Sequence, residues 1–158
     1  MKNTIFAALA AVALAAPAAA TEKFTGVRVE ATVGADSVIN GVDRTDVKYG
    51  AAAGFDIKVL PRVTAGLEAS VANVFDRADI GVAARLGYTV TNNVLVYGRA
   101  GYSNFRQLPG LELEGLQVGG GVEVAVVGPV YAGLEYRYTD FSGRVGQHGG
   151  LARVGLRF

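Results

Sequence analysis

The chain has 158 residues, with 15 lysines and arginines against 14 acidic residues, one histidine and no cysteine. The lack of cysteine excludes disulfides, a thiol nucleophile and cysteine-ligated zinc, and the single His148 leaves little scope for a histidine metal site. The near-neutral balance gives no basic footprint for nucleic acid. We therefore expect no cofactor, no metal and no nucleic-acid partner.

The first twenty residues have the pattern of a secretory signal peptide. Lys2 supplies the positive start, residues 5–16 are apolar, and Pro17 precedes three alanines of the kind that a signal peptidase accepts. The apolar run is shorter than the roughly 20 residues of a membrane-spanning helix, and it lacks the polar face of a buried amphipathic helix. The pattern predicts that residues 1–20 are cleaved and that residues 21–158 form one exported domain.

From Phe24 onward, apolar and polar residues alternate in eight runs of about ten, which predicts strands with one apolar face. In chain order these runs cover residues 27–33, 48–58, 64–71, 79–88, 94–103, 117–126, 130–139 and 153–158. Proline, asparagine and glycine predict tight turns at 60–62, 91–93 and 128–129. The alternate connections, at 35–46, 75–78, 104–115 and 141–148, are expected to be mostly longer.

The charged residues decide which environment this alternation fits, because each of them falls on the polar face of its own strand. They are Arg28, Glu30, Lys48, Asp56, Lys58, Glu68, Asp79, Arg85, Arg99, Glu123, Glu135, Arg137, Arg153 and Arg157. A soluble sandwich or lipocalin-like barrel would bury the apolar face, whereas a membrane barrel turns it to lipid and encloses the charges.

Two features favour the membrane. The apolar faces hold many alanines and glycines, which would fill a water-soluble core poorly. They also carry tyrosines near strand ends, as an interfacial girdle does: Tyr49, Tyr88, Tyr102, Tyr136 and Tyr138. The sequence therefore predicts an all-β fold, a closed eight-stranded antiparallel up-and-down transmembrane β-barrel. By loop length, the tight turns and both termini should face the periplasm.

Several short motifs resemble the OmpA-like and opacity-type outer-membrane β-barrels. In chain order they are Gly66-Leu67-Glu68, Ala84-Arg85-Leu86-Gly87-Tyr88, Gly120-Gly121-Val122-Glu123, the turn Gly128-Pro129, Leu134-Glu135-Tyr136-Arg137-Tyr138 and Val154-Gly155-Leu156-Arg157-Phe158. The resemblance covers essentially all of the expected mature chain and omits the C-terminal peptidoglycan-binding domain of the larger members.

The resemblance implies a lumenal gate of acidic and basic side chains that exchange partners. Glu68, Arg85 and Glu123 fall at gate-like positions. The chain departs from the family where Gly133 replaces an arginine, so that a gate here would be absent or would use Arg137 or Arg99. These residues and Glu135 are the candidate lumenal ion pairs.

The resemblance also implies function, location and partners. We expect a small structural or surface-interaction barrel of the cell outer membrane, in contact with its lipid and lipopolysaccharide, with a lumen filled by ion pairs. The alternative is a narrow or gated porin-like channel for small solutes. Phe158, with Leu156 and Val154, is the expected signal for the barrel-insertion machinery, with periplasmic chaperones assisting export.

Three other interpretations carry less weight. The glycine run 119–121 lacks the lysine and serine or threonine of a phosphate-binding loop. Arginines in the predicted loops, at 44, 77, 106 and 144, could bind a surface ligand but are typical of solvated loops. Some eight-stranded barrels are lipid A-modifying enzymes with serine, histidine and an acidic residue, but His148 has no neighbouring serine in a His-x-Ser pattern. We expect no enzymatic activity.

Overall fold

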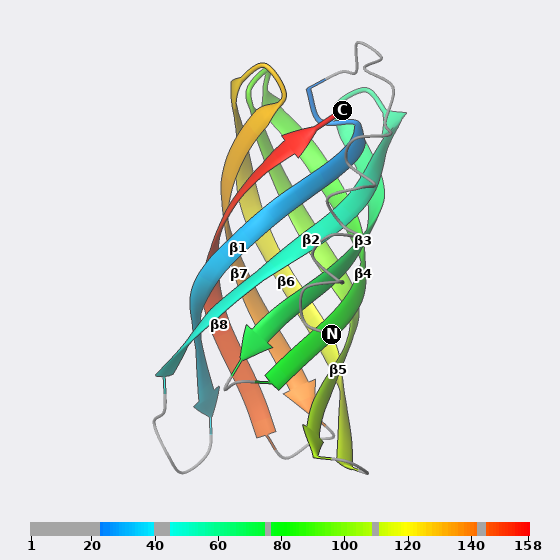
Figure 1. Ribbon diagram of the computed structural model, residues 1–158. Coiled ribbons are helices and arrows are strands. Elements are labelled where there is room, and N and C mark those ends of the chain that lie inside the picture. The colour runs from blue at the N-terminus through cyan, green and yellow to red at the C-terminus, as the bar shows by residue number, and fades with distance from the viewer. Residues whose placement is uncertain (1–22, 40–44, 75–76, 109–110, 142–144) are drawn as a thin grey trace.

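The computed structural model describes residues 23–39, 45–74, 77–108, 111–141 and 145–158, which form one closed antiparallel barrel (Figure 1). Each strand pairs with its neighbours in the chain, and the last pairs with the first. The strands are β1 (Gly26–Ile39), β2 (Thr45–Leu60), β3 (Val63–Val74), β4 (Arg77–Thr91), β5 (Val94–Leu108), β6 (Leu111–Val127), β7 (Val130–Phe141) and β8 (Val145–Arg157). The predicted eight-stranded up-and-down barrel is confirmed.

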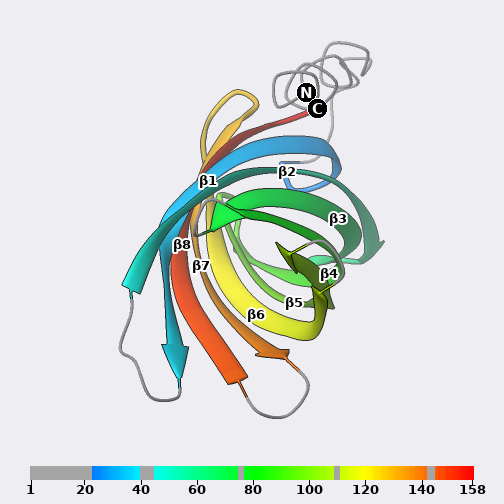
Figure 2. The same ribbon diagram turned by 60° about the horizontal axis from the view of Figure 1, so that its bottom comes forward.

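The barrel closes along β1 and β8, from Arg28 opposite Arg157 to Ile39 opposite Gly146. Beyond that ladder, the Val27 amide donates to the Phe158 carbonyl at 3.0 Å and the Phe158 amide donates to the Val27 carbonyl at 2.8 Å. Closure leaves no unpaired sheet edge, which is the condition for strands to cross a hydrocarbon layer that offers no water. Figure 2 shows the eight strands following one another around this ring.

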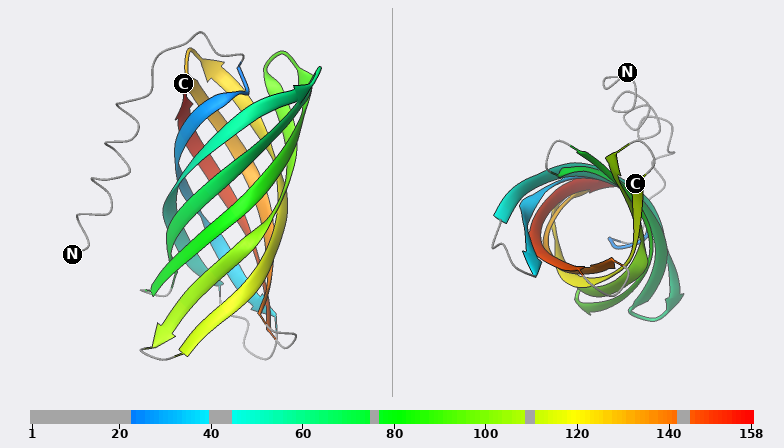
Figure 3. Two further views of the ribbon diagram at one scale, coloured as in Figure 1. Left: turned by 90° about the vertical axis from the view of Figure 1, so that its right-hand side faces the viewer. Right: turned by 90° about the horizontal axis from the view of Figure 1, so that it is seen from below.

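The two ends of the barrel differ. One end, here called the turn end, carries the turns at residues 61–62, 92–93 and 128–129 together with the start of β1 and the end of β8 (Figures 1 and 3). The predicted tight turns are therefore confirmed. The opposite end is here called the loop end. There the strands are longer than the sequence predicted, and the connections between them are residues 40–44, 75–76, 109–110 and 142–144.

The prediction of long connections at the loop end was wrong because hydropathy alternation marks only the part of a strand that contacts lipid. Beyond that part both faces can be polar, so the pattern fades while the hydrogen-bonded ladder continues. Asp36, which the prediction placed in the first long connection, thus lies within β1 and is buried inside the barrel.

The apolar faces point outward along every strand. Leu67, Leu134 and Val127 are about 70% exposed, at 69, 68 and 71%, as expected for side chains that contact lipid in place of a protein core. The five girdle tyrosines are also on this outer surface: Tyr49, Tyr88, Tyr102, Tyr136 and Tyr138. The charged faces point inward, into the lumen.

Two predictions concern residues outside the described ranges. The signal peptide at 1–20 lies there, as do the loop arginines at 44 and 144. In the part of the chain that the structure describes, no helix has the length and apolar character to span a bilayer.

Candidate functional site

The lumen holds a layer of buried charge to which all eight strands contribute. Its buried cations are Arg28, Lys48, Arg85, Arg99, Arg137, Arg153 and Arg157, and its buried carboxylates are Glu30, Asp36, Asp56, Glu68, Glu123 and Glu135. Isolated charges could not be held in such a place, since each ion loses its hydration and needs a partner of opposite sign. The arrangement of these partners is therefore the main chemical feature of the molecule.

Glu68 on β3 is surrounded by arginines from other strands. Its Oε2 lies 2.9 Å from Arg28 Nη1 and 3.1 Å from Arg153 Nη2, and its Oε1 lies 3.3 Å from Arg99 Nη2. Arg85 is more distant, with Nη1 3.8 Å from Oε2. One carboxylate thus ties β3 to β1, β4, β5 and β8 across the full width of the lumen.

Arg153 on β8 is the counterpart among the cations. It forms ion pairs with Glu30 on β1, Glu68 on β3 and Glu135 on β7. Its side chain has no measurable exposure, and its guanidinium carbon lies 5.3 Å from the centre of the Tyr97 ring. Removal of this one side chain would leave three buried carboxylates without a shared partner.

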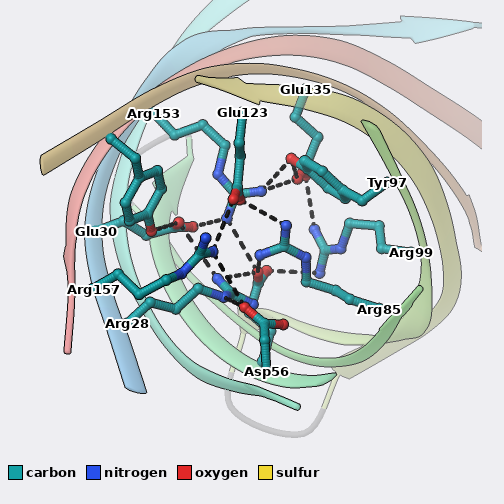
Figure 4. A network of polar contacts seen from close by, with 12 residues as sticks. Arg28, Glu30, Asp56, Arg85, Tyr97, Arg99, Glu123, Glu135, Arg153 and Arg157 are labelled. Atoms are coloured by element: carbon teal, nitrogen blue, oxygen red, sulfur yellow. Dashed lines mark hydrogen bonds and ion pairs between the residues drawn. The ribbon is translucent and has the colours of Figure 1, made fainter. Parts of the chain in front are cut away.

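Two further carboxylates extend the network toward the turn end (Figure 4). Glu123 accepts from Arg85 at 2.6 Å and from Arg157 at 2.8 Å. Asp56 accepts from Arg28 at 2.9 Å and from Arg157 at 3.2 Å. The ion pairs are therefore continuous from strand to strand.

Two tyrosines complete the packing by offering both a ring and a hydroxyl. The Tyr97 hydroxyl donates to Glu135 at 2.6 Å and the Tyr131 hydroxyl donates to Glu30 at 2.5 Å. The Arg85 guanidinium lies 3.9 Å from the centre of the Tyr97 ring, at cation–π distance. The rings thus fill space between charged groups while each hydroxyl satisfies a carboxylate.

A smaller polar layer lies nearer the loop end. Lys48 Nζ is 2.9 Å from Asp79 and 3.2 Å from Asp36, which also accepts from Gln147 at 2.8 Å. Ser103 donates to the other oxygen of Asp79. This layer continues the pairing of opposite charges beyond the arginine–glutamate network toward the loop end.

Inward-facing glycines provide the room that these long side chains occupy. A Cβ on Gly54 would lie 2.6 Å from Arg28 Nη2, and a Cβ on Gly121 would lie 2.6 Å from the Tyr97 hydroxyl. Both distances are far below van der Waals contact. The glycine run at 119–121 is thus packed within β6, as expected for close approach in a strand and unlike a phosphate loop.

The candidate gate residues are brought together, with one difference from the expected set. Arg99 contacts both Glu68 and Glu135, whereas Glu135 is the one carboxylate that Arg137 contacts among the described residues. The residue that faces Gly133 is Arg153, its direct partner in the β7–β8 register. Arg153 on the adjacent strand thus supplies a cation beside Gly133. Alternation predicts that Arg153 faces the lumen, but it does not assign this residue to the gate, because strand register does not follow from alternation.

At the turn end of the lumen, Phe24 is only 4% exposed and packs as a plug with Leu95 and Tyr97. Gly26 has φ of 106°, which lets the chain turn from this plug into β1. Viewed along the barrel, the start of the described chain projects inside the ring of strands (Figure 3, right). Arg157 donates from Nη1 to the Lys23 carbonyl at 3.2 Å and fixes that segment.

His148 lies on the outer surface of β8, away from this network. Its cross-strand partners are Tyr138 on β7 and Ser37 on β1, and its ring centroid is 6.2 Å from that of Tyr136. In the sequence, the serine nearest to His148 is Ser142. Ser37 was missed because the pairing of the first and last strands brings together residues 111 positions apart.

A closed barrel with lipid-facing apolar strands and an ion-paired interior defines an integral membrane β-barrel. The matching family model, the outer membrane protein beta-barrel domain, covers residues 6–158, and the chain belongs to that family. It lies in the cell outer membrane, in contact with the lipid of that bilayer.

Solved structures of other small outer-membrane barrels share the fold at low sequence identity. Neisserial surface protein A is 19% identical with a TM-score of 0.58, over 85% of this chain and 98% of that one. The attachment invasion locus protein Ail of Yersinia pestis is 13% identical with a TM-score of 0.59, over 85% and 100%. The N-terminal barrel of Pseudomonas aeruginosa OprF is 14% identical with a TM-score of 0.59, over 85% and 99%. No curated protein matches the sequence.

Proposed function

We propose that the protein is a structural and surface-interaction barrel whose lumen is sealed. The observation that carries this proposal is the continuous ion-pair network around Glu68 and Arg153, closed at the turn end by Phe24. Eight strands enclose a space that side chains just fill, and here those side chains hold each other in place. The barrel then serves as a rigid support for what its loop end presents.

We propose that the turn end faces the periplasm and the loop end faces outward, where lipopolysaccharide and surface ligands are met. The position of both strand termini, the start of β1 and the end of β8, at the turn end supports this orientation, as do the connections 40–44 and 142–144 at the loop end, which are longer than the two-residue turns. Ail of Yersinia pestis has been crystallised in complex with the heparin analogue sucrose octasulfate, so that protein binds a sulfated ligand. A surface-binding assay that compares intact cells with and without this protein tests whether it binds an external ligand.

The second candidate is a gated pore, and the spacing of one ion pair favours it. Arg85 pairs with Glu123 at 2.6 Å but lies 3.8 Å from Glu68, and its Nη1 and Nε make no hydrogen bond to described atoms. A rotation of this side chain could therefore exchange Glu123 for Glu68. In this arrangement Glu68, Arg85 and Glu123 form the gate, and Arg99, Glu135, Arg137 and Arg153 hold the surrounding charge.

Planar-bilayer recording separates the two candidates. For a sealed lumen, we expect no discrete conductance from folded protein, and none from the Arg85→Ala variant if the remaining arginines hold the seal. For a gate, discrete openings should occur in the wild type and should change in frequency or size in Arg85→Ala. Openings in the wild type would contradict the sealed lumen.

We propose that the barrel has no catalytic role. His148 and Ser37 lie opposite each other on the outer surface, and the other cross-strand partner of His148 is Tyr138. The contact with Tyr136 supports a place for His148 in the aromatic girdle at the membrane interface.

We propose that residues 1–20 are a cleaved export signal and that Phe158, Leu156 and Val154 form the signal read by the barrel-insertion machinery, with periplasmic chaperones protecting the chain before insertion. The outward position of Val154 and Leu156, 54 and 39% exposed, supports a lipid-facing alternating signal. The backbone pairing of Phe158 with Val27 supports a role in the final closure.

A further inference from the structure

We propose that the turn end of the barrel holds a binding site for an oxyanion, a phosphate or carboxylate group. The site is a cavity of about 410 Å³, here called the vestibule. Its lining includes three cationic side chains and several neutral hydrogen-bonding ones: Lys23, Lys58, Arg62, Thr64, Thr89 and Asn92. They come from the chain start, β2, the β2–β3 turn, β3, β4 and the β4–β5 turn, so the fold itself assembles the cavity.

The charge of the vestibule differs from that of the lumen. Inside the lumen, cations and carboxylates alternate and neutralise one another, as around Glu68. Among the described residues that line the vestibule there is no aspartate or glutamate, while Lys23, Lys58 and Arg62 are all positive. The potentials of like charges around one concave space add, and they concentrate anions there.

The backbone of Arg62 supports a functional reason for its side chain. Arg62 follows Pro61 in a two-residue turn and has φ of 72°, a left-handed conformation that favours glycine or asparagine at the third position of such a turn. The Thr89 amide donates to the Arg62 carbonyl at 2.8 Å and fixes the turn against β4. A charged residue held at a strained position beside a cavity is typical of a ligand site.

The inner wall of the vestibule includes a buried aromatic ring, which a ligand would meet before the lumen. Phe24 lines the cavity and packs on its other side against Leu95 and Tyr97. Lys23 is directed across the turn end, donating to Asn93 Oδ1 at 2.5 Å. A bound anion thus meets cations at the rim and an aromatic floor, and does not reach the arginines of the network.

The ligand class follows from these donors. Lysine and arginine give charge-assisted hydrogen bonds to phosphate and carboxylate oxygens, and the Thr64 and Thr89 hydroxyls and the Asn92 amide add neutral ones. A cavity of this size accommodates a small polyanionic group. That group could be a free anion in the water at the turn end or part of a phospholipid headgroup. The same cationic and neutral donors would bind either one.

Calorimetric titration of inorganic pyrophosphate into the barrel in neutral phosphatidylcholine nanodiscs tests the site. We expect saturable binding of one pyrophosphate per barrel that weakens as salt is raised. Arg62→Gly should lower the affinity at least tenfold while relieving the strained turn, so loss of folding would not explain the result. Arg62→Lys should retain most of the affinity, and Lys58→Gln should lower it.

The matched control is Arg77→Gln, at the start of β4 on the loop end, which should bind as the wild type does. Absence of saturable binding, or equal affinity in Arg62→Gly, would overturn the proposal. Nanodiscs that contain phosphatidylglycerol identify the source of the anion. If phosphatidylglycerol lowers the apparent affinity for pyrophosphate in the wild type but not in Arg62→Gly, the site binds a lipid headgroup. If phosphatidylglycerol leaves the affinity for pyrophosphate unchanged, the site binds a water-borne anion.

Discussion

Replacing Arg153 by methionine should lower the free energy of unfolding by about 3–5 kcal/mol, the usual result of removing one partner from a buried charge cluster. Methionine keeps much of the volume, so the loss is electrostatic. Glu30, Glu68 and Glu135 would each lose a guanidinium, and all three side chains are at most 1% exposed. Glu30 is most affected, because its remaining cation is Arg28 at 3.4 Å.

Urea unfolding of the barrel in lipid vesicles measures this change, and Arg137→Met is the matched control. In the part of the chain that the structure describes, Arg137 pairs with Glu135 alone, and Glu135 keeps Arg99 at 3.0 Å and Arg153 when Arg137 is lost. Its loss should therefore cost clearly less. Equal unfolding curves for the Arg153 variant and the wild type would show that the network does not depend on this residue.

Deleting Phe158 should reduce the amount of folded barrel in the outer membrane severalfold and increase periplasmic degradation. The deletion removes both backbone hydrogen bonds between Phe158 and Val27, the last pairing between β8 and β1 at the turn end. An incompletely closed seam leaves polar backbone groups facing lipid. The deletion also removes the terminal aromatic that we propose is read during insertion.

Heat-modifiability measures this result, because a folded barrel resists detergent and migrates differently on a gel until it is boiled. His148→Ala is the control, since it leaves the backbone pairing of β8 with β1 intact, and this variant should assemble normally. Normal assembly after deletion of Phe158, together with loss of an activity in His148→Ala, would contradict the assembly role and favour an enzyme.

Much of the fold could be predicted because a membrane barrel has a strict period of two. Each strand has one face in lipid and one in a charged lumen, so the side of Leu67 and of Glu68 follows from alternation alone. Strand length was less predictable. Asp36 and Gln147 pair inside the barrel beyond the apolar part of β1 and β8, where alternation no longer indicates a strand.

The candidate site was predicted as a set of residues but not as a set of pairs. Alternation places Glu68, Arg85 and Glu123 in the lumen, but it does not determine which side chains meet across the barrel. That depends on strand register and tilt. Arg153 illustrates the point, since its partners lie on β1, β3 and β7 and its position opposite Gly133 follows from the β7–β8 register.

The vestibule could not be inferred from sequence for a related reason. Lys23, Lys58 and Arg62 are scattered over the chain start, the end of β2 and a turn, and no spacing rule connects them. Arg62 gave a weak signal, because arginine is unusual at the left-handed position of a tight turn. Only the closed topology brings these cations around one cavity.

A sealed membrane barrel requires that the apolar face of each strand contacts lipid and that the charged face is enclosed. Single cysteines in this cysteine-free chain test that arrangement directly. Ala84→Cys and Ala53→Cys are on outward positions, and Ala83→Cys and Ala52→Cys are on neighbouring buried ones, 5 and 3% exposed. In folded protein in lipid vesicles, we expect a membrane-soluble maleimide to label only the outward pair, and a charged maleimide to label neither pair until the barrel is unfolded. Labelling of the buried pair by the charged reagent in the folded protein would contradict a lipid-facing apolar surface around a sealed, ion-paired lumen.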